Sequence, residues 1–211
     1  MTIEELIIEY RKLGNYKTKD LDNLNKRLIK EKVDVSFLKD KVIGEDEFHR
    51  TYFQVSMGQL KTTEEKLDFI YENRLALNDW WHVDQLTQFV KNLDLDDVYK
   101  RAKEYVKHPH AYLRRWGYVI FMPGLVKDKR SFDMIVSLLK DDPHYHVIMA
   151  EAWLISYLAI YHPDRTFEYL NNCDLSYSIV SKAIQKICDS FRVDDRTKER
   201  FKSIRSKYKS K

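Results

Sequence analysis

Apolar residues recur at helical spacing along almost the whole chain, with charged and polar residues between them. This pattern predicts helices over residues 2–13, 18–32, 34–44, 46–61, 62–77, 77–86, 94–108, 111–122, 131–142, 144–163, 164–172, 176–191 and 196–211. Only 5 glycines and 4 prolines occur in 211 residues, so tight turns are few and helices with short loops fit better than a sheet. The sequence therefore predicts an all-α protein.

Capping residues support the start of two of these helices. Thr2 and Glu5 have the spacing of a capping box, in which each side chain bonds the other's backbone N–H. A second capped start is predicted at Thr63, with Glu65 or Lys66 on the first turn.

The second half of the chain repeats a pair of helices. Three helices have apolar anchors at Leu113, Val147 and Ile179, which lie 34 and 32 residues apart, and each follows a shorter amphipathic helix. Stacked helix pairs form α-solenoids of the HEAT type, whose concave surface is the usual binding face. We expect one domain over residues 1–211, a right-handed α-solenoid of HEAT-like repeats. A general helical bundle is the alternative that the same periodicity allows.

Basic residues are unevenly distributed in a chain of formal net charge +4. Residues 196–211 carry eight Lys or Arg against one Glu, and Lys107, Arg114 and Arg115 lie among histidines and aromatic residues. Basic residues among aromatic ones favour a polyanion such as DNA or RNA. For the C-terminal segment alone, a solvated helix end is the better explanation of the composition.

Metal and nucleotide chemistry lack the motifs that they need. His108 and His110, like His144 and His146, form H-x-H pairs, but residues two apart on a helix do not face each other. We therefore expect exposed loop histidines, no metal and no cofactor. There is no glycine-rich phosphate loop, no nucleophile elbow and no cysteine spacing suited to zinc.

Export and membrane signals are not found in the sequence. The first residues, MTIEELIIEYRKLG, are charged and amphipathic and lack the apolar core of a signal peptide. No apolar run approaches membrane-spanning length. We expect a cytoplasmic monomer that does not bind membranes.

The stretch LNDWWHVDQL, residues 77–86, places an acid among aromatic residues. The residues that share one face at helical spacing are Leu77, Trp80, Trp81 and Asp84. A buried carboxylate is costly unless it is paired or working, so this face is expected to carry a site. For Trp81, and for Trp116 further on, a core position is the better interpretation.

Arg115 and Trp153 lie on the principal helices of two successive repeats. Arg115 is expected off the core stripe that contains Trp116, and it differs from Arg114 by about 100° around the helix axis, so at most one of the two points at a given ligand. Equivalent positions of successive repeats line the same surface of a solenoid. The pattern favours a concave wall with two tryptophans, a carboxylate and an arginine.

These segments resemble the AlkD-type DNA alkylation repair proteins, the HEAT-like repeat DNA glycosylases. WWHVD matches that family's Trp-x-x-Val-Asp segment with Trp80 and Asp84, and YLRRWGYV matches its aromatic-Leu-x-Arg helix with Arg115. In WLISYLAIYHP, Trp153 and Pro163 have the family's spacing, and LSYSIVSKA is similar to a further family helix. The resemblance covers residues 45–187.

The resemblance implies an enzyme that hydrolyses the N-glycosidic bond of N3- or N7-alkylated purines in duplex DNA. Such a purine is already cationic and leaves readily, so catalysis needs stabilisation of the oxocarbenium-like sugar and a placed water. By the resemblance Asp84 would do both. Trp80 and Trp153 would hold the sugar and backbone through their faces.

For DNA binding, the resemblance implies that Arg115 clamps a phosphate, unless Arg114 makes that contact instead. Lys107 and the basic segment 196–211 would add sequence-independent affinity. The resemblance further implies that the base is not enclosed in a pocket. A location at the nucleoid within the cytoplasm would follow.

Two other functions stay open at this point. The family's N-terminal Gly-Val-x-x-Pro-x-Leu-Arg-like segment has no counterpart before Asp46, which favours a member of the family that binds DNA without catalysis. A HEAT-type protein-interaction scaffold is the other alternative, and its concave face should carry hydrophobic anchors without organised charge.

Overall fold

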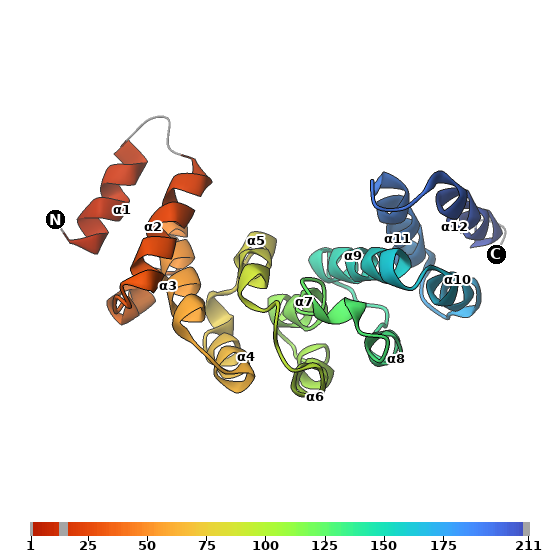
Figure 1. Cartoon of the computed structure of the whole chain (residues 1–211), viewed down its shortest axis with the longest axis horizontal. Helices are drawn as coiled ribbons and strands as arrows, with labels where there is room; N and C mark the ends of the chain where they lie inside the picture. Colours follow the sequence, from red (N-terminus) through yellow and green to blue (C-terminus); the bar gives the residue numbers. More distant parts are fainter. Residues whose placement is uncertain (1, 13–16, 209–211) are drawn as a thin grey trace. The chain divides into compact units, whose positions relative to one another are not determined.

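A computed structural model describes residues 2–12 and 17–208, and these residues form helices and connecting loops without a strand. The prediction of an all-α protein is confirmed. The α-helices are α1 (Ile3–Lys12), α2 (Thr18–Lys30), α3 (Asp46–Gln59), α4 (Thr63–Glu72), α5 (Trp80–Asp84), α6 (Leu95–Tyr105), α7 (Ala111–Val119), α8 (Ser131–Val136), α9 (Tyr145–Tyr161), α10 (Pro163–Asn172), α11 (Tyr177–Asp189) and α12 (Asp195–Tyr208) (Figure 1). The 3₁₀ helices are η1 (Ser36–Lys41), η2 (Arg74–Ala76), η3 (Gln85–Phe89) and η4 (Leu125–Lys127).

Residue contacts group the chain into two compact units, Met1–Phe89 (unit 1) and Val90–Lys211 (unit 2). Each unit has fully buried apolar side chains of its own, such as Phe53 in unit 1 and Trp116 in unit 2. The single domain over residues 1–211 and its right-handed solenoid with a concave face stay predictions.

Helix α3 is the centre of unit 1. It packs along α2 and contacts η1 and η3, while α1 contacts α2 and η3 continues directly from α5. Phe53, Val55 and Met57 on α3 are fully buried, as are Leu21 on α2 and Leu86 on η3. The segment that carries the tryptophan pair is therefore attached to α3 through η3.

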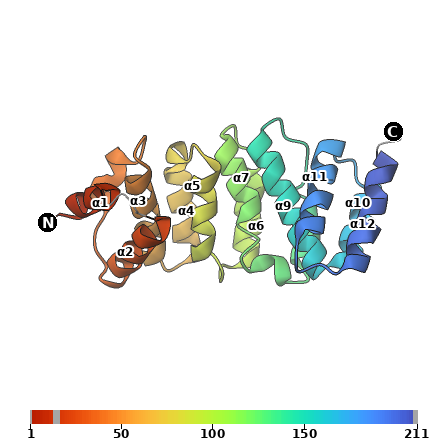
Figure 2. The ribbon, with the colours of Figure 1, turned by 90° about the horizontal axis from the view of Figure 1, so that it is seen from above.

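Consecutive principal helices lie side by side in unit 2: α7 packs on α9, and α9 on α11 (Figure 2). The repeat anchors Leu113, Val147 and Ile179 are fully buried on these three helices. Helices α6, α8 and α10 precede them as predicted, although α6 has 11 residues and is longer than α7, which has 9.

A glycine allows α7 to lie close to the end of α6. A Cβ atom at Gly117 on α7 would lie 2.9 Å from Val106 Cγ1 and 3.2 Å from Tyr105 Cβ at the end of α6. Any larger residue would force the two helices apart, which explains the glycine in YLRRWGYV.

One predicted cap is confirmed and the other is displaced by one residue. Thr2 N–H donates to Glu5 Oε2 at 2.7 Å and Glu5 N–H donates to Thr2 Oγ1 at 3.1 Å, which is a capping box. For α4 the predicted cap at Thr63 is wrong. Thr62 makes the box, because its Oγ1 accepts from Glu65 N–H at 3.1 Å and its N–H donates to Glu65 Oε2 at 2.8 Å.

Helix α8 ends at Val136, well before the predicted boundary at Asp142. The backbone that follows bonds to other elements: the Leu138 carbonyl accepts from Tyr118 Oη at 3.1 Å, and Lys140 N–H donates to Glu151 Oε1 at 3.1 Å. The carboxyl of Glu151 on α9 is thus buried in unit 2 with a backbone partner.

We expect Glu151→Gln to change how stability depends on pH. Burial raises the pKa of Glu151 from its ordinary 4.5 to about 8, against the opposing effect of the Lys140 N–H. Because the folded chain holds this proton and the unfolded chain does not, the free energy of unfolding falls as pH rises between these values. The amide of the variant has no proton to lose in this range. The free energy of unfolding of the variant should therefore rise relative to that of wild type by several kcal/mol (~1.4 per pH unit) between pH 5 and pH 8.

Urea unfolding of both proteins at pH 5 and pH 8 measures this difference. Glu104→Gln, an exposed glutamate on α6, is the matched control and should show no such change. An unfolding free-energy difference between wild type and Glu151→Gln that is equal at the two pH values contradicts the buried, protonated carboxyl.

Candidate functional site

Helix α5 begins at Trp80, three residues later than a stripe from Leu77 requires. Asp79 has an extended backbone, and its carboxylate accepts from Trp80 N–H at 2.6 Å, so it is the N-cap of α5. Leu77 lies before the cap and is fully buried. The predicted face of Leu77, Trp80, Trp81 and Asp84 is therefore wrong, whereas Trp80 and Asp84 do lie one helical turn apart on α5.

Trp80 and Trp81 line a pocket of about 350 Å³. Trp80 is 47% exposed and Trp81 is half-buried, so the predicted core position of Trp81 is only partly correct, in contrast to Trp116, which is fully buried. Asp84 is half-buried. The rest of the pocket wall comes from α2 and α3 and consists of Thr18, Leu21, Asp46, Glu47 and Arg50.

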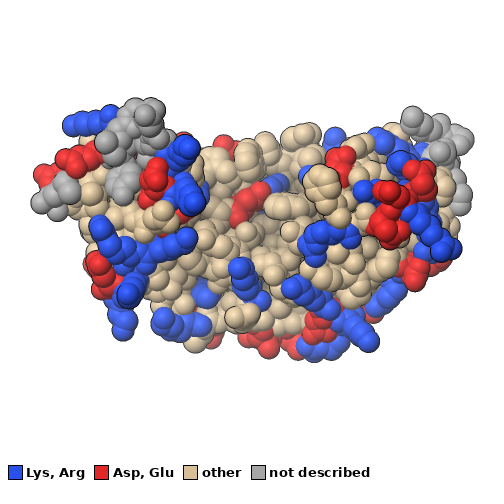
Figure 3. Space-filling view, turned by 45° about the horizontal axis from the view of Figure 1, so that its top comes forward, with Lys and Arg blue, Asp and Glu red and all other residues tan. Residues whose placement is uncertain are grey.

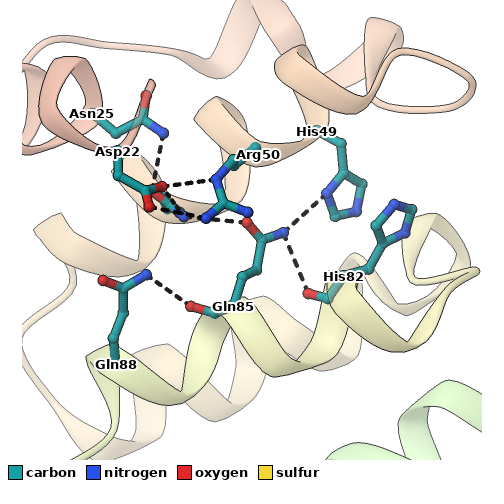
Figure 4. Close-up of polar contacts among 8 residues, drawn as sticks. Asp22, Asn25, His49, Arg50, His82, Gln85 and Gln88 are labelled. Atoms are coloured by element: carbon teal, nitrogen blue, oxygen red, sulfur yellow. Dashed lines mark hydrogen bonds and ion pairs between the residues drawn. The ribbon is translucent and has the colours of Figure 1, made fainter. Parts of the chain in front are cut away.

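An ion pair joins α2 to α3 beside this pocket (Figure 4). Arg50 donates to both carboxylate oxygens of Asp22, at 2.7 and 3.0 Å, and Gln54 Nε2 donates to Asp22 Oδ1 at 3.0 Å. Burial alone would raise the pKa of Asp22, but the hydrogen bonds from Arg50 and Gln54 outweigh it and hold the pKa below its ordinary value. Asp22 is therefore ionised at neutral pH.

Gln85, the residue after Asp84, connects this ion pair to a buried histidine. Gln54 Nε2 lies 3.3 Å from Gln85 Oε1, and Gln85 Nε2 lies 3.2 Å from His49 Nδ1 (Figure 4). The other ring nitrogen of His49 lies 3.2 Å from the Ala76 carbonyl oxygen. The connected residues thus come from α2, α3, η2 and η3.

The rings of His49 and His82 stack with centroids 3.6 Å apart, and Trp81 packs edge-on to His82 at 4.2 Å. Burial, and secondly the neighbouring His82, lowers the pKa of His49 to about 3. Burial also lowers the pKa of His82, whose Nδ1 accepts from Asn78 N–H at 3.3 Å. Two neutral imidazoles therefore join α5 to α3.

Trp153 lies on α9 in unit 2, half-buried, and lines a second pocket of about 320 Å³. Two cations lie over aromatic rings here: Lys186 Nζ is 5.9 Å from the Trp153 ring centroid, and the Arg192 guanidinium is 5.5 Å from that of Tyr157. Lys186 and Arg192 were not among the residues predicted for the site. Trp153, Tyr157 and Tyr161 recur every four residues, and this aromatic stripe is the signal that could have found them. The other residues of the pocket wall are Ser156, Ile160, Asp189 and Ser190.

Arg114 is fully engaged within unit 2. Its guanidinium donates to both oxygens of Asp142, at 2.6 and 3.0 Å, and to the backbone carbonyls of His108 and Pro109 at 3.0 and 2.8 Å. Burial alone would raise the pKa of Asp142, but the hydrogen bonds from Arg114 and from His144 N–H outweigh it and hold the pKa low. Arg114 is therefore an internal ion-pair partner.

Arg115 lies between α7 and α9 and is only 4% exposed, so the prediction that it lies off the core stripe is wrong. Its guanidinium donates to the His146 carbonyl of the next principal helix. Helices α7 and α9 pack along each other, which covers a position that an isolated helix would present to solvent. Contact of Arg115 or Arg114 with a phosphate stays a prediction. Lys107, the third predicted DNA contact, has an exposed side chain.

The four histidines of the H-x-H pairs are half-buried, so their predicted exposure is wrong, although His108, His110 and His144 lie in loops as predicted. The ring centroid of Tyr112 lies 5.5 Å from that of His144 and 6.0 Å from that of His146. Within residues 2–12 and 17–208, no three His, Cys, Asp or Glu side chains are placed to hold a metal ion. In that same part of the chain no helix is long and apolar enough to cross a membrane.

The predicted site residues fall in both units. Trp80 and Asp84 belong to unit 1, and Trp153 belongs to unit 2 together with the predicted DNA contacts Lys107, Arg114 and Arg115. Within unit 1 the structure brings Trp80 and Asp84 onto one short helix. Their combination with Trp153 in one site stays a prediction.

Comparison with known families gives one match: the model of the family described as DNA alkylation repair enzyme covers residues 7–187. The matched range includes Trp80, Asp84, Arg115 and Trp153. Searches of curated proteins and of solved structures gave no match.

Loss of the Arg114 side chain is expected to destabilise unit 2 strongly. The Arg114 and Asp142 side chains are 13% and 3% exposed, so Arg114→Met leaves a buried carboxylate without its counter-ion. Such a change costs about 3–5 kcal/mol. Lys107→Met, at an exposed basic position nearby in the sequence, should stay within about 0.5 kcal/mol of wild type. Urea unfolding measures both values, and equal stability of the two variants contradicts an internal role for Arg114.

Proposed function

The chain belongs to the DNA alkylation repair enzyme family, and from this we propose that it is a DNA glycosylase that removes N3- or N7-alkylated purines from duplex DNA. The observation that supports the proposal is the match over residues 7–187, because it covers both tryptophan-bearing segments, α5 and α9. A role in DNA alkylation repair follows from the family. The type of reaction and the lesion are the proposed part, as is a location at the nucleoid.

In the proposed reaction Asp84 acts on the sugar. The oxygen of a water molecule bonds to the anomeric carbon as the C–N bond breaks, and the electron pair of that bond neutralises the departing cationic purine. Asp84 accepts the proton of the water, and its negative charge stabilises the positive charge that develops on the sugar. No acid is needed for the leaving group, since the alkylated base leaves as a neutral molecule.

Trp80 and Trp153 suit contact with the damaged nucleotide. Trp80 presents about half of its surface to solvent on the same helix as Asp84, and Trp153 lines the pocket in unit 2. The electron-rich face of an indole attracts a cationic sugar at close range. Trp80 would therefore assist Asp84 in stabilising the transition state.

Affinity for the phosphate backbone would come from exposed cations. Figure 3 shows Lys and Arg side chains spread over the face in view, with Asp and Glu among them. Lys107 and Arg192 are exposed, and Lys186 borders the Trp153 pocket. These three are better placed for phosphate contact than Arg114 and Arg115, whose guanidinium groups bond within unit 2.

The family match also bears on the alternatives. It speaks against a protein-interaction scaffold, because the family acts in DNA alkylation repair. A family member that binds DNA without catalysis is distinguished from the enzyme by its failure to release base.

Base release from duplex DNA with N7-methylguanine is expected for the wild type and not for Asp84→Asn. The amide keeps the shape of the side chain and removes its charge and its ability to take a proton, so kcat should fall at least about 100-fold. Asp40→Asn, an exposed carboxylate on η1, is the matched control and should keep full activity. Binding of this DNA by the wild type without base release would establish the non-catalytic alternative.

Arg192→Gln is expected to weaken binding to any duplex sequence alike. The loss of one phosphate contact should lower the slope of log K against log salt by about 0.9. Fluorescence anisotropy between low and moderate salt measures this slope with undamaged and alkylated duplexes. An unchanged slope would show that Arg192 does not contact the backbone.

A further inference from the structure

The donor and the acceptor of each hydrogen bond in Figure 4 can be assigned, starting from the carboxylate of Asp22. An ionised carboxylate only accepts, so the atom of Gln54 that lies 3.0 Å from Asp22 Oδ1 is the amide nitrogen. Gln54 Oε1 is then free to accept from Asn25 Nδ2, which lies at 3.0 Å. Arg50 donates from Nε and from Nη2 to Asp22 and keeps it charged.

The orientation of Gln54 determines that of Gln85. Since Gln54 presents a donor, the atom of Gln85 that faces it at 3.3 Å is the carbonyl oxygen. The amide nitrogen of Gln85 therefore points the other way, 3.2 Å from His49 Nδ1 and 3.4 Å from the backbone carbonyl of His82. This donor can only be received by a lone pair.

His49 must therefore be neutral, with its proton on Nε2. Nδ1 accepts from Gln85, and the Ala76 carbonyl oxygen, which can only accept, receives Nε2–H at 3.2 Å. Each hydrogen atom from Asp22 to Ala76 is thus assigned by its neighbours. Protonation of Nδ1 would set two donors against each other and break the connection at Gln85.

The other charged groups around these rings do not offer Nδ1 of His49 an acceptor. His82 on α5 stacks on the ring and Arg50 lies on the same helix, and both disfavour a positive charge there. The charges of Asp46 and Asp79 raise the pKa of His82 rather than that of His49. The Asp22 carboxylate accepts from Arg50 and Gln54. Neutral His49 is consequently the state that fits all its neighbours.

We propose that Gln85 is a positioning residue for the site on α5: its amide, held between Gln54 and neutral His49, fixes the end of the helix that carries Trp80 and Asp84. The proposal rests on the proposed function. Gln85 follows Asp84 in the chain, and its amide donates to the His82 carbonyl of α5. Its two side-chain partners, Gln54 and His49, belong to α3. Helix α5 has only 5 residues and cannot hold its own orientation, so these bonds and the His49–His82 stack, together with the buried Val83 and Leu86, hold it.

Gln85→Glu tests the proposal with a minimal change of shape. The carboxylate still accepts from Gln54, but it cannot donate to His49 or to the His82 carbonyl. With neutral His49 two lone pairs now face each other, whereas protonated His49 can donate Nδ1–H to the new carboxylate. The variant should therefore raise the pKa of His49 and recover its connection as pH falls. Gln88→Glu is the matched control, since it adds the same charge on η3 and removes only the bond from Gln88 Nε2 to the Gln85 carbonyl.

Base release from the N7-methylguanine duplex is measured from pH 5 to pH 8 for the three proteins. For Gln85→Glu we expect kcat to fall about 10- to 100-fold at pH 8, with KM changed less than about twofold, and to recover toward pH 5. Wild type and Gln88→Glu should lack this recovery at low pH. A Gln85→Glu profile parallel to that of wild type would overturn the proposal, because a purely structural defect would lower activity equally at every pH.

Nitrogen NMR of the histidine rings in the wild type tests the assignment without any substitution. We expect His49 to be neutral with the proton on Nε2 throughout pH 5–8, and a charged ring or a proton on Nδ1 overturns the proposal. This measurement also decides the matter if Gln85→Glu does not fold. If the wild type releases no base while His49 has the expected form, the proposed function fails and with it the catalytic role of Gln85, but the assigned hydrogen bonds stand.

Discussion

Burial of polar side chains between closely packed helices is the constraint on which both units depend. Helices bury one another's faces, and a polar group that loses water there must find a partner or change its charge. In unit 2, Arg114 finds Asp142 and Arg115 finds a backbone carbonyl of the next helix. In unit 1, Arg50 finds Asp22.

Where burial outweighs the effect of nearby charges, the buried group is neutral. Glu151 is protonated, and His49 and His82 are neutral because they lack the second ring proton. In each case burial is the main cause. In unit 1 the neutral form of His49 is required for a hydrogen bond, because only a neutral imidazole can accept from Gln85. The same constraint thus determines the protonation states and the attachment of α5 to α3.

Helical periodicity was sufficient to predict the all-α class and the buried anchors such as Leu113 and Val147. Boundaries depended on single hydrogen bonds that periodicity does not contain. Asp79 starts α5 at Trp80, and Thr62 rather than Thr63 starts α4. Side chains that meet across helices were beyond reach for the same reason: the burial of Arg115 comes from α9, and the contact between Gln85 and His49 joins residues 36 positions apart.

Neutral histidines have a further consequence for a cationic substrate. His82 lies two residues before Asp84 on α5, and the two rings that attach this helix to α3 are both imidazoles. An imidazolium on the helix that carries Asp84 would oppose the positive charge that develops on the sugar, because like charges repel strongly in a partly buried site. Burial lowers the pKa of both rings, so they attach α5 to α3 by stacking and hydrogen bonds in their neutral form. Neither ring then opposes the positive charge of the transition state that the proposed reaction requires Asp84 to stabilise.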